Sequence, residues 1–145
     1  MKKILFAVCF ALLLVGCGNN KQDKYITEFK YEYGGGWSTT YSYEIKQKDD
    51  KYVFTYKETL KDADVIIKYV SKKNMKKLSD LIDKYEIDKW NGFDKSQDNI
   101  YDGSYFSLNV KYNNGDVINA HGYMMTPDNY NEASEELIDF LNGLK

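Results

Sequence analysis

The sequence contains no arginine, a single histidine, a single proline and two cysteines. Because arginine is absent, the chain cannot make the bidentate guanidinium contacts that recognise phosphate and carboxylate groups. All 20 basic residues are lysines, and 22 acidic residues give a formal net charge of −2. Nucleic-acid binding needs a basic stripe, so we expect no nucleic-acid partner.

The two cysteines, Cys9 and Cys17, both lie near the N-terminus. The rest of the chain therefore has no disulfide, no thiolate metal site and no free thiol. Its stability must come from a packed core, for which a chain of 145 residues is long enough. We expect no cofactor and no metal ion.

The N-terminus has the pattern of a secretory signal. Lys2 and Lys3 are followed by an uninterrupted apolar run over residues 4–15. A helix that spans a membrane needs roughly 20 apolar residues, so this run is too short to be one. A positive start followed by a short apolar region is instead typical of a signal that is removed during secretion.

The end of this region, Leu14-Val15-Gly16-Cys17, resembles the lipobox of bacterial lipoproteins. The resemblance implies that the Cys17 sulfur carries a diacylglyceryl group and that the signal peptide, residues 1–16, is removed. Residues 17–24 are then the lipidated cysteine and a flexible tether. The implied location is the extracytoplasmic face of the cell membrane of a Gram-positive cell, with membrane lipid as a partner through acylated Cys17. The alternative is an ordinary signal peptide with an incidental cysteine.

Alternation of apolar and polar side chains with a period of two predicts strands that are separated by short polar turns. The six predicted strands cover residues 25–33, 37–45, 52–56, 65–70, 106–112 and 117–123. Between the last two, Asn114-Gly115 is a strong hairpin signal. Short connections of this kind favour antiparallel pairing.

Two stretches have helical spacing of their apolar residues. The first follows Ser71, placed as its N-cap, and the second starts near Pro127 and ends near Gly143. The polar side of the first helix is rich in lysine, which indicates either a solvated face or a contact with anionic lipid headgroups. Residues 25–145 therefore predict a single α+β domain of order ββββ-α-ββ-α, an antiparallel sheet with two amphipathic helices packed on its buried face.

The chain has 14 tyrosines, many of them in the predicted strands. Tyrosine suits a half-buried strand, because its ring packs while its hydroxyl stays in contact with water. The alternative is an exposed aromatic platform that binds a sugar or a peptide.

A second resemblance covers the C-terminal part of the chain. The motifs are Trp90-Asn91-Gly92-Phe93, Asp102-Gly103-Ser104-Tyr105-Phe106-Ser107-Leu108, Asn114-Gly115-Asp116 and Gly122. They are similar to a pattern in small uncharacterised lipoproteins of Gram-positive bacteria, a family that implies no activity. Trp90 and Phe93 either cap the edge of the sheet or, with Asp98 and Asp102, line a ligand-binding pocket.

The loop that carries Asp94, Asp98 and Asp102 has carboxylates of the kind that hold a hard cation such as calcium. Counted from Asp98, the EF-hand spacing fails, because Ile100 and Asn109 occupy two of the ligand positions. The alternative is a polar surface loop whose aspartates and glycine serve turns.

These observations favour a non-enzymatic binding or interaction module at the membrane, with an envelope protein, a peptide or a glycan as its ligand. The alternative is an inhibitor or accessory subunit that docks on another envelope protein through a tyrosine-rich sheet face. A hydrolase that uses the single histidine, His121, as a general base is less favoured, because no known nucleophile motif accompanies it.

Overall fold

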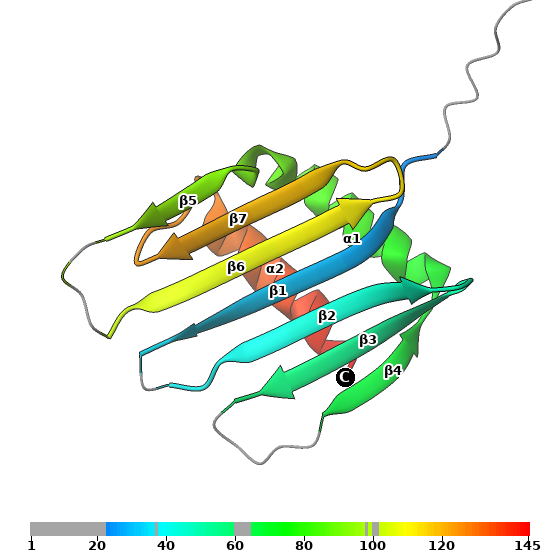
Figure 1. Ribbon diagram of the computed structural model, residues 1–145, viewed down its shortest axis with the longest axis horizontal. Coiled ribbons are helices and arrows are strands. Elements are labelled where there is room, and N and C mark those ends of the chain that lie inside the picture. Colours follow the sequence, from blue (N-terminus) through cyan, green and yellow to red (C-terminus); the bar gives the residue numbers. More distant parts are fainter. Residues whose placement is uncertain (1–22, 37, 60–64, 98, 100–101) are drawn as a thin grey trace, which may run out of the picture.

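The computed structural model describes residues 23–36, 38–59, 65–97, 99 and 102–145 (Figure 1). These residues form one seven-stranded sheet with two α-helices on one of its faces. The order across the sheet is β4-β3-β2-β1-β6-β7-β5. The expected lipid attachment at Cys17, and Asp98 of the candidate pocket, lie outside the described residues.

The strands are β1 (Ile26–Gly35), β2 (Tyr41–Lys48), β3 (Lys51–Glu58), β4 (Ile66–Val70), β5 (Phe93–Ser96), β6 (Ser104–Tyr112) and β7 (Val117–Tyr123). The helices are α1 (Lys72–Lys84) and α2 (Tyr130–Asn142), and a short 3-10 helix, η1 (Ile87–Trp90), follows α1. All strand pairs are antiparallel except β5 with β7. The fold is therefore mixed α+β with a mostly antiparallel sheet, as the sequence predicts.

The element order differs from the expected ββββ-α-ββ-α by one additional strand. Both β5 and η1 lie in a stretch that was expected to be a loop. β5 has only four residues and three of them are exposed, so no alternation marks it in the sequence. It is defined by parallel pairing with β7, in which Phe93 lies opposite Ala120. A strand that depends on its partner in this way cannot be recognised from its own residues.

The structure confirms one predicted helix start and one predicted hairpin, and it corrects the start of the second helix. The Ser71 side chain accepts a hydrogen bond from the Asn74 backbone N–H at 3.2 Å, which confirms the expected N-cap. The hairpin at Gly115 is also confirmed, and the φ of 90° at this glycine is in the left-handed region that glycine tolerates. The expected start of α2 near Pro127 is wrong, because Asn129 adopts a left-handed turn and the helix begins only after it.

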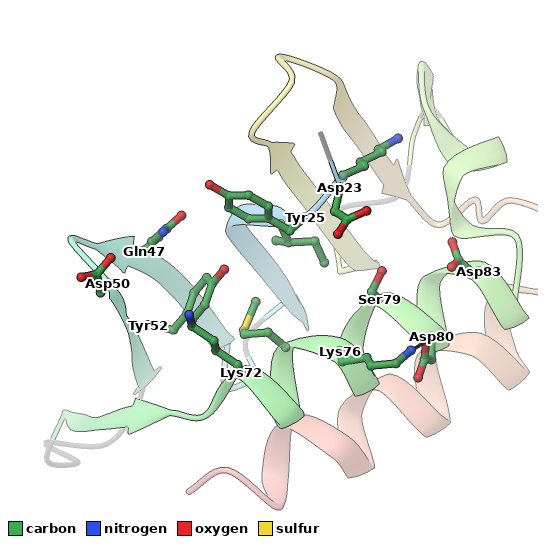
Figure 2. Close-up of a pocket in the computed structure, with 13 residues that line it drawn as sticks. Asp23, Tyr25, Gln47, Asp50, Tyr52, Lys72, Lys76, Ser79, Asp80 and Asp83 are labelled. Atoms are coloured by element: carbon green, nitrogen blue, oxygen red, sulfur yellow. Dashed lines mark hydrogen bonds and ion pairs between the residues drawn. The ribbon is translucent and has the colours of Figure 1, made fainter. Parts of the chain in front are cut away.

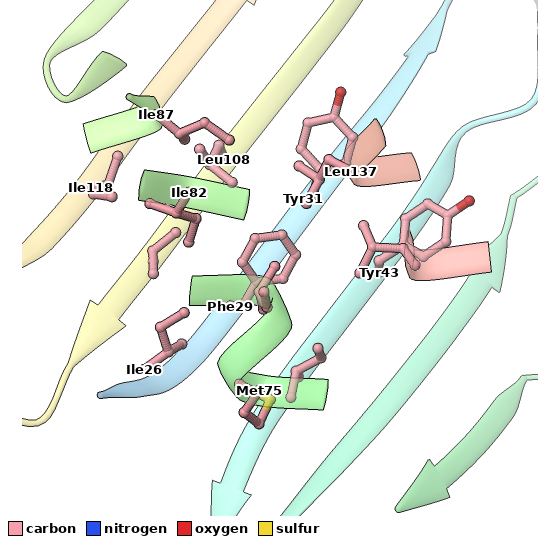
Figure 3. Packing of buried hydrophobic residues seen from close by; sticks show 14 of the residues in the cluster. Ile26, Phe29, Tyr31, Tyr43, Met75, Ile82, Ile87, Leu108, Ile118 and Leu137 are labelled. Carbon is pink, nitrogen blue, oxygen red and sulfur yellow. The ribbon is translucent and has the colours of Figure 1, made fainter. Parts of the chain in front are cut away.

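The core lies between the sheet and the two helices (Figure 3). The first three strands contribute Phe29, Tyr31, Tyr43, Ile45 and Phe54, and the helices contribute Met75, Leu78, Ile82, Leu137 and Leu141. All residues of this cluster lie between Ile26 and Leu144. The core of the described chain is therefore formed within residues 23–145.

Several tyrosines of the strand alternation face this core. Tyr31 and Tyr43 are fully buried, and Tyr56 is nearly so. The hydroxyls of Tyr31 and Tyr130 form a hydrogen bond of 2.9 Å, and the Tyr43 hydroxyl donates to Asn142 Oδ1 at 2.8 Å. Tyr31, Tyr43 and Tyr56 are therefore packed strand tyrosines, and no exposed aromatic platform is built from these three. Tyr25 and Tyr69, in contrast, are exposed.

We call the opposite side of the sheet the open face, because no helix of the described chain covers it (Figure 1). It is mostly polar, and the Glu28 carboxylate lies between the ammonium groups of Lys111 at 3.0 Å and Lys46 at 3.8 Å. On the edge strand β4, Ile67 and Tyr69 are exceptions to this polarity, at 65% and 74% exposed. The open face is therefore a solvated surface with one apolar edge.

Candidate binding site

A cleft opens between α1, the start of β1 and the turn that joins β2 to β3 (Figure 2). We call it the α1 cleft. Its volume is about 730 Å³, inside the range of roughly 300–1,000 Å³ that is usual for small-molecule sites. Its residues come from three separate stretches of the chain, 23–26, 47–52 and 72–83. The cleft is therefore a product of the fold.

Helix α1 supplies one wall of the cleft. The residues of this wall are Lys72, Met75, Lys76, Ser79, Asp80 and Asp83. Their spacing of three and four residues places them along one side of the helix. The N-cap at Ser71 fixes the first turn of α1, from which Lys72 extends along the rim.

The floor of the cleft is apolar. Ile26 and Met75 are only 2% and 7% exposed, and the Tyr52 ring is buried with them. Tyr25 forms an outer wall and is 41% exposed. The Tyr25 backbone N–H donates to Asn113 Oδ1 at 2.9 Å, which holds this residue beside the β6–β7 turn. A ligand would thus meet an apolar floor and one accessible aromatic ring.

The Tyr52 hydroxyl is a polar group on this floor. Figure 2 shows it pointing into the cleft, between Tyr25 and Lys72. The residue is only 7% exposed, and its hydroxyl has no hydrogen-bond partner among the described residues. Burial, and to a smaller degree the nearby Tyr25, raises the pKa of Tyr52. The hydroxyl is therefore neutral and free to donate or accept a hydrogen bond from a ligand.

The rim carries charges of both signs, and some of them neutralise one another. Lys76 Nζ lies 2.8 Å from Asp80 Oδ1 within α1. Lys24 Nζ lies 2.9 Å from Asp116 Oδ2, and this hydrogen bond lowers the pKa of Asp116. These two lysines are held by protein carboxylates and offer little charge to a ligand.

Four other rim charges remain available. The side chains of Lys72, Asp23, Asp50 and Asp83 are exposed and make no ion pair with any described residue. They surround the apolar floor from different segments (Figure 2). The cleft therefore combines three open carboxylates, one open ammonium group and the Tyr52 hydroxyl around an apolar centre.

Trp90 and Phe93 lie together at the edge of the core. The Trp90 indole N–H donates to Asn129 Oδ1 at 3.2 Å, and the rings of both residues lie 6.1 Å from the Phe106 ring. They also line a second, smaller depression of about 510 Å³. Trp90 is only 2% exposed, so it presents almost no surface to a ligand there. This geometry favours their role as a cap on the sheet edge over their role in a pocket.

Asp102 does not line this second depression. It lies beside Gly36, so close that a Cβ added to Gly36 would come within 1.2 Å of Asp102 Oδ1. The structure therefore does not bring Trp90, Phe93 and Asp102 to one site. For the cation hypothesis, no group of three metal-binding side chains occurs in the part of the chain that the structure describes.

His121 lies on the open face in β7. Its Nδ1 is 3.4 Å from Asp94 Oδ1 on β5, and Ser107 is its direct partner on β6. Asp, His and Ser thus cross three adjacent strands in one row. His121 lines neither the α1 cleft nor the second depression, so neither cavity presents a substrate to it. The row therefore lies on the open face, apart from both cavities.

The sequence contained little sign of the α1 cleft. Tyr25 and Tyr52 fit the strand alternation, and Lys72 and Asp83 fit the polar side of a helix. The one feature of the sequence that relates to the cleft is the row of polar residues at helical spacing after Ser71. This spacing predicts one side of a helix, but it does not predict which segments lie opposite that side.

No protein-family model matches the chain, and no curated protein matches it at a significant level. Within the described residues, no helix has both the length and the apolar character needed to cross a membrane. Function is therefore inferred from the α1 cleft and its surroundings.

Proposed function

We propose that this protein is a non-enzymatic binding module, held at the extracytoplasmic face of the membrane through acylated Cys17, and that the α1 cleft is its ligand site. The observation that carries the proposal is the cleft itself, with an apolar floor, an unpartnered Tyr52 hydroxyl and open charges on its rim. Largely apolar pockets with a few convergent polar groups are the usual form of a binding site.

The position of the cleft supports a ligand in the cell envelope. Residues 23–25 line the cleft, and the proposed tether covers residues 17–24. An extended chain spans at most about 3.5 Å per residue, so the few residues between Cys17 and Asp23 reach about 20 Å. The ligand site would therefore lie close to the membrane surface, where an envelope protein, a peptide or a glycan is available.

A second candidate function is that of an accessory subunit or inhibitor that docks on another envelope protein. Tyr31, Tyr43 and Tyr56 cannot serve it, because they are buried under the helices. The exposed side chains of Ile67 and Tyr69 on β4 are the observation in its favour. A contact through this edge would leave the α1 cleft unoccupied.

The anchor is tested by metabolic labelling with a fatty-acid probe in a Gram-positive host. The wild-type chain is expected to take up the label, and Cys17→Ser is expected to abolish it. Equal labelling of both chains would contradict the lipid attachment.

The site is tested by immobilising residues 23–145 and exposing them to solubilised cell envelope, with proteins and glycans analysed separately. We expect Tyr25→Ala to abolish specific capture and Tyr69→Ala to leave it unchanged. The two variants are matched, because each removes an exposed tyrosine: Tyr25 directly before β1 and Tyr69 within β4. Loss of capture in Tyr69→Ala alone would favour docking through β4 and contradict the α1 cleft as the site.

A further inference from the structure

We propose that the ligand of the α1 cleft is a neutral oligosaccharide, seated against the Tyr25 ring and hydrogen-bonded by the rim. This inference rests on the proposed function, since it names the class of ligand for the same site. Three features of the cleft support it: the repulsion of anionic ligands by its open charges, the polar groups of its rim and the aromatic and hydroxyl groups of its floor and outer wall.

The charges of the rim select against an anionic ligand. The lining contains three lysines, Lys24, Lys72 and Lys76, and four aspartates, Asp23, Asp50, Asp80 and Asp83. Lys24 and Lys76 are paired with Asp116 and Asp80, so the open charges are three carboxylates and one ammonium group. A polyanion would meet net repulsion there, and a neutral ligand avoids that cost.

The open polar groups suit the hydroxyls of a sugar. The carboxylates of Asp23, Asp50 and Asp83 each have two oxygens that accept hydrogen bonds, and the Lys72 ammonium donates. A sugar hydroxyl both donates and accepts, so it pairs with either kind of group. Hydrogen bonds to charged groups are stronger than those between neutral groups, which allows a small set of contacts to hold a neutral ligand.

The floor supplies the remaining contacts. A sugar ring has faces made of C–H groups, and these match an aromatic ring such as Tyr25, which is 41% exposed, and the apolar surface of Met75. The Tyr52 hydroxyl points into the same space and has no hydrogen-bond partner among the described residues. No fully buried side-chain polar atom among these residues lacks a partner, so this hydroxyl is the part of the residue that solvent reaches. A ligand hydroxyl at this point would form a hydrogen bond with it in place of solvent.

The test is a nuclear magnetic resonance titration of isotope-labelled residues 23–145 with three neutral tetrasaccharides, chitotetraose, cellotetraose and maltotetraose. At least one of them is expected to shift the backbone amides of Tyr25, Tyr52 and Ser79 in a saturable manner. Binding should change little as salt is added, because the ligand is uncharged.

Three variants make the test specific. Tyr25→Ala should weaken binding by about tenfold or more, which corresponds to about 1.4 kcal/mol. Tyr52→Phe should weaken binding several-fold while leaving the unfolding midpoint in urea unchanged, since its hydroxyl has no protein partner to lose. Tyr69→Ala, on the open face, should leave binding as in the wild type.

Two results would overturn the proposal. One is the absence of saturable shifts in the cleft with any of the three sugars, and the other is sugar binding that Tyr25→Ala does not weaken. Trilysine is titrated in parallel, and its binding in the cleft without sugar binding would assign a basic peptide instead. If envelope capture depends on Tyr25 while the sugars fail, the binding module stands and only its ligand class is refuted.

Discussion

The two faces of the sheet are built from the same strands, yet they have opposite chemistry. In β2, Tyr43 and Ile45 are fully buried against the helices, whereas Ser42 before them and Glu44 between them reach the open face. In β3, Phe54 is buried and its neighbour Thr55 is only half-buried. A difference of one residue in position thus decides whether a side chain supports the core or contacts water.

Tyrosine has different roles on the two faces of the sheet. On the covered face, tyrosine rings fill the core and their hydroxyls bond at its margins, as with Tyr31 and Tyr130. On the open face, Tyr69 is 74% exposed and contacts little beyond the Lys51 ammonium, 5.2 Å from its ring. The same residue type is therefore structural on one face and available for contact on the other.

The largest loss of folding stability is expected at high pH, where ionisation of the buried tyrosines opposes the packing of the covered face. Burial raises the pKa of Tyr31, Tyr43 and Tyr56 far above the ordinary value near 10, and that of Tyr112 to about 12. Above pH 10 the unfolded chain loses protons that the folded chain keeps. Stability is therefore complete below about pH 10 and is lost as the pH rises toward 12 and beyond.

Circular dichroism and tyrosinate absorbance, recorded together from pH 8 upward, check this prediction. The part of the absorbance change that comes from the buried rings should coincide with the loss of the circular dichroism signal, because these rings ionise only on unfolding. The control is Tyr69→Phe, which should leave the transition unmoved. Ionisation of most tyrosines well before loss of structure would show that the covered rings are accessible. That result would contradict the difference between the two faces.

The next effect compares neighbouring residues on the two faces of β3. Phe54→Ala should lower the free energy of unfolding by about 3–5 kcal/mol, through lost apolar burial and the cavity left in the core. Thr55→Ala, one residue along the same strand, should change it by about 0.5 kcal/mol or less. Urea denaturation of residues 23–145 measures both. Similar losses for the two variants would contradict the assignment of the faces.

The smallest effect is expected on the open face. Glu28→Gln removes the carboxylate between Lys111 and Lys46, and should cost about 1 kcal/mol or less because these ion pairs are partly in water. The loss should shrink when urea denaturation is repeated at high salt, since salt screens exposed charges. A larger loss that salt does not alter would show that this face is more protected than its exposure indicates.

Much of the fold could be predicted because its signals are local. The alternation around Tyr43 and Phe54 marks strands, Ser71 caps a helix, and Gly115 turns a hairpin, each through its own backbone and near neighbours. β5 could not be predicted, because a four-residue strand without alternation exists only through its pairing with β7.

The candidate site could not be predicted from the sequence in the same way. Trp90 and Phe93 are adjacent in the fold, but Trp90 is part of the core and Asp102 lies beside Gly36 instead. The α1 cleft joins Tyr25, Tyr52 and α1, none of which carries a motif. Aspartate and tyrosine have many ordinary structural uses, so only their convergence marks a site.

The sequence by itself determined the class of fold, the periods of its strands and helices, and the resemblance of Leu14-Val15-Gly16-Cys17 to a lipobox. These are properties of neighbouring residues, and hydrophobic periodicity and short motifs record them directly. The tertiary structure alone decided the order of the strands, the partner of β5 and the cleft in which Tyr25 and Tyr52 meet α1. Contacts between distant segments depend on how whole elements pack, and that information is distributed over the entire core.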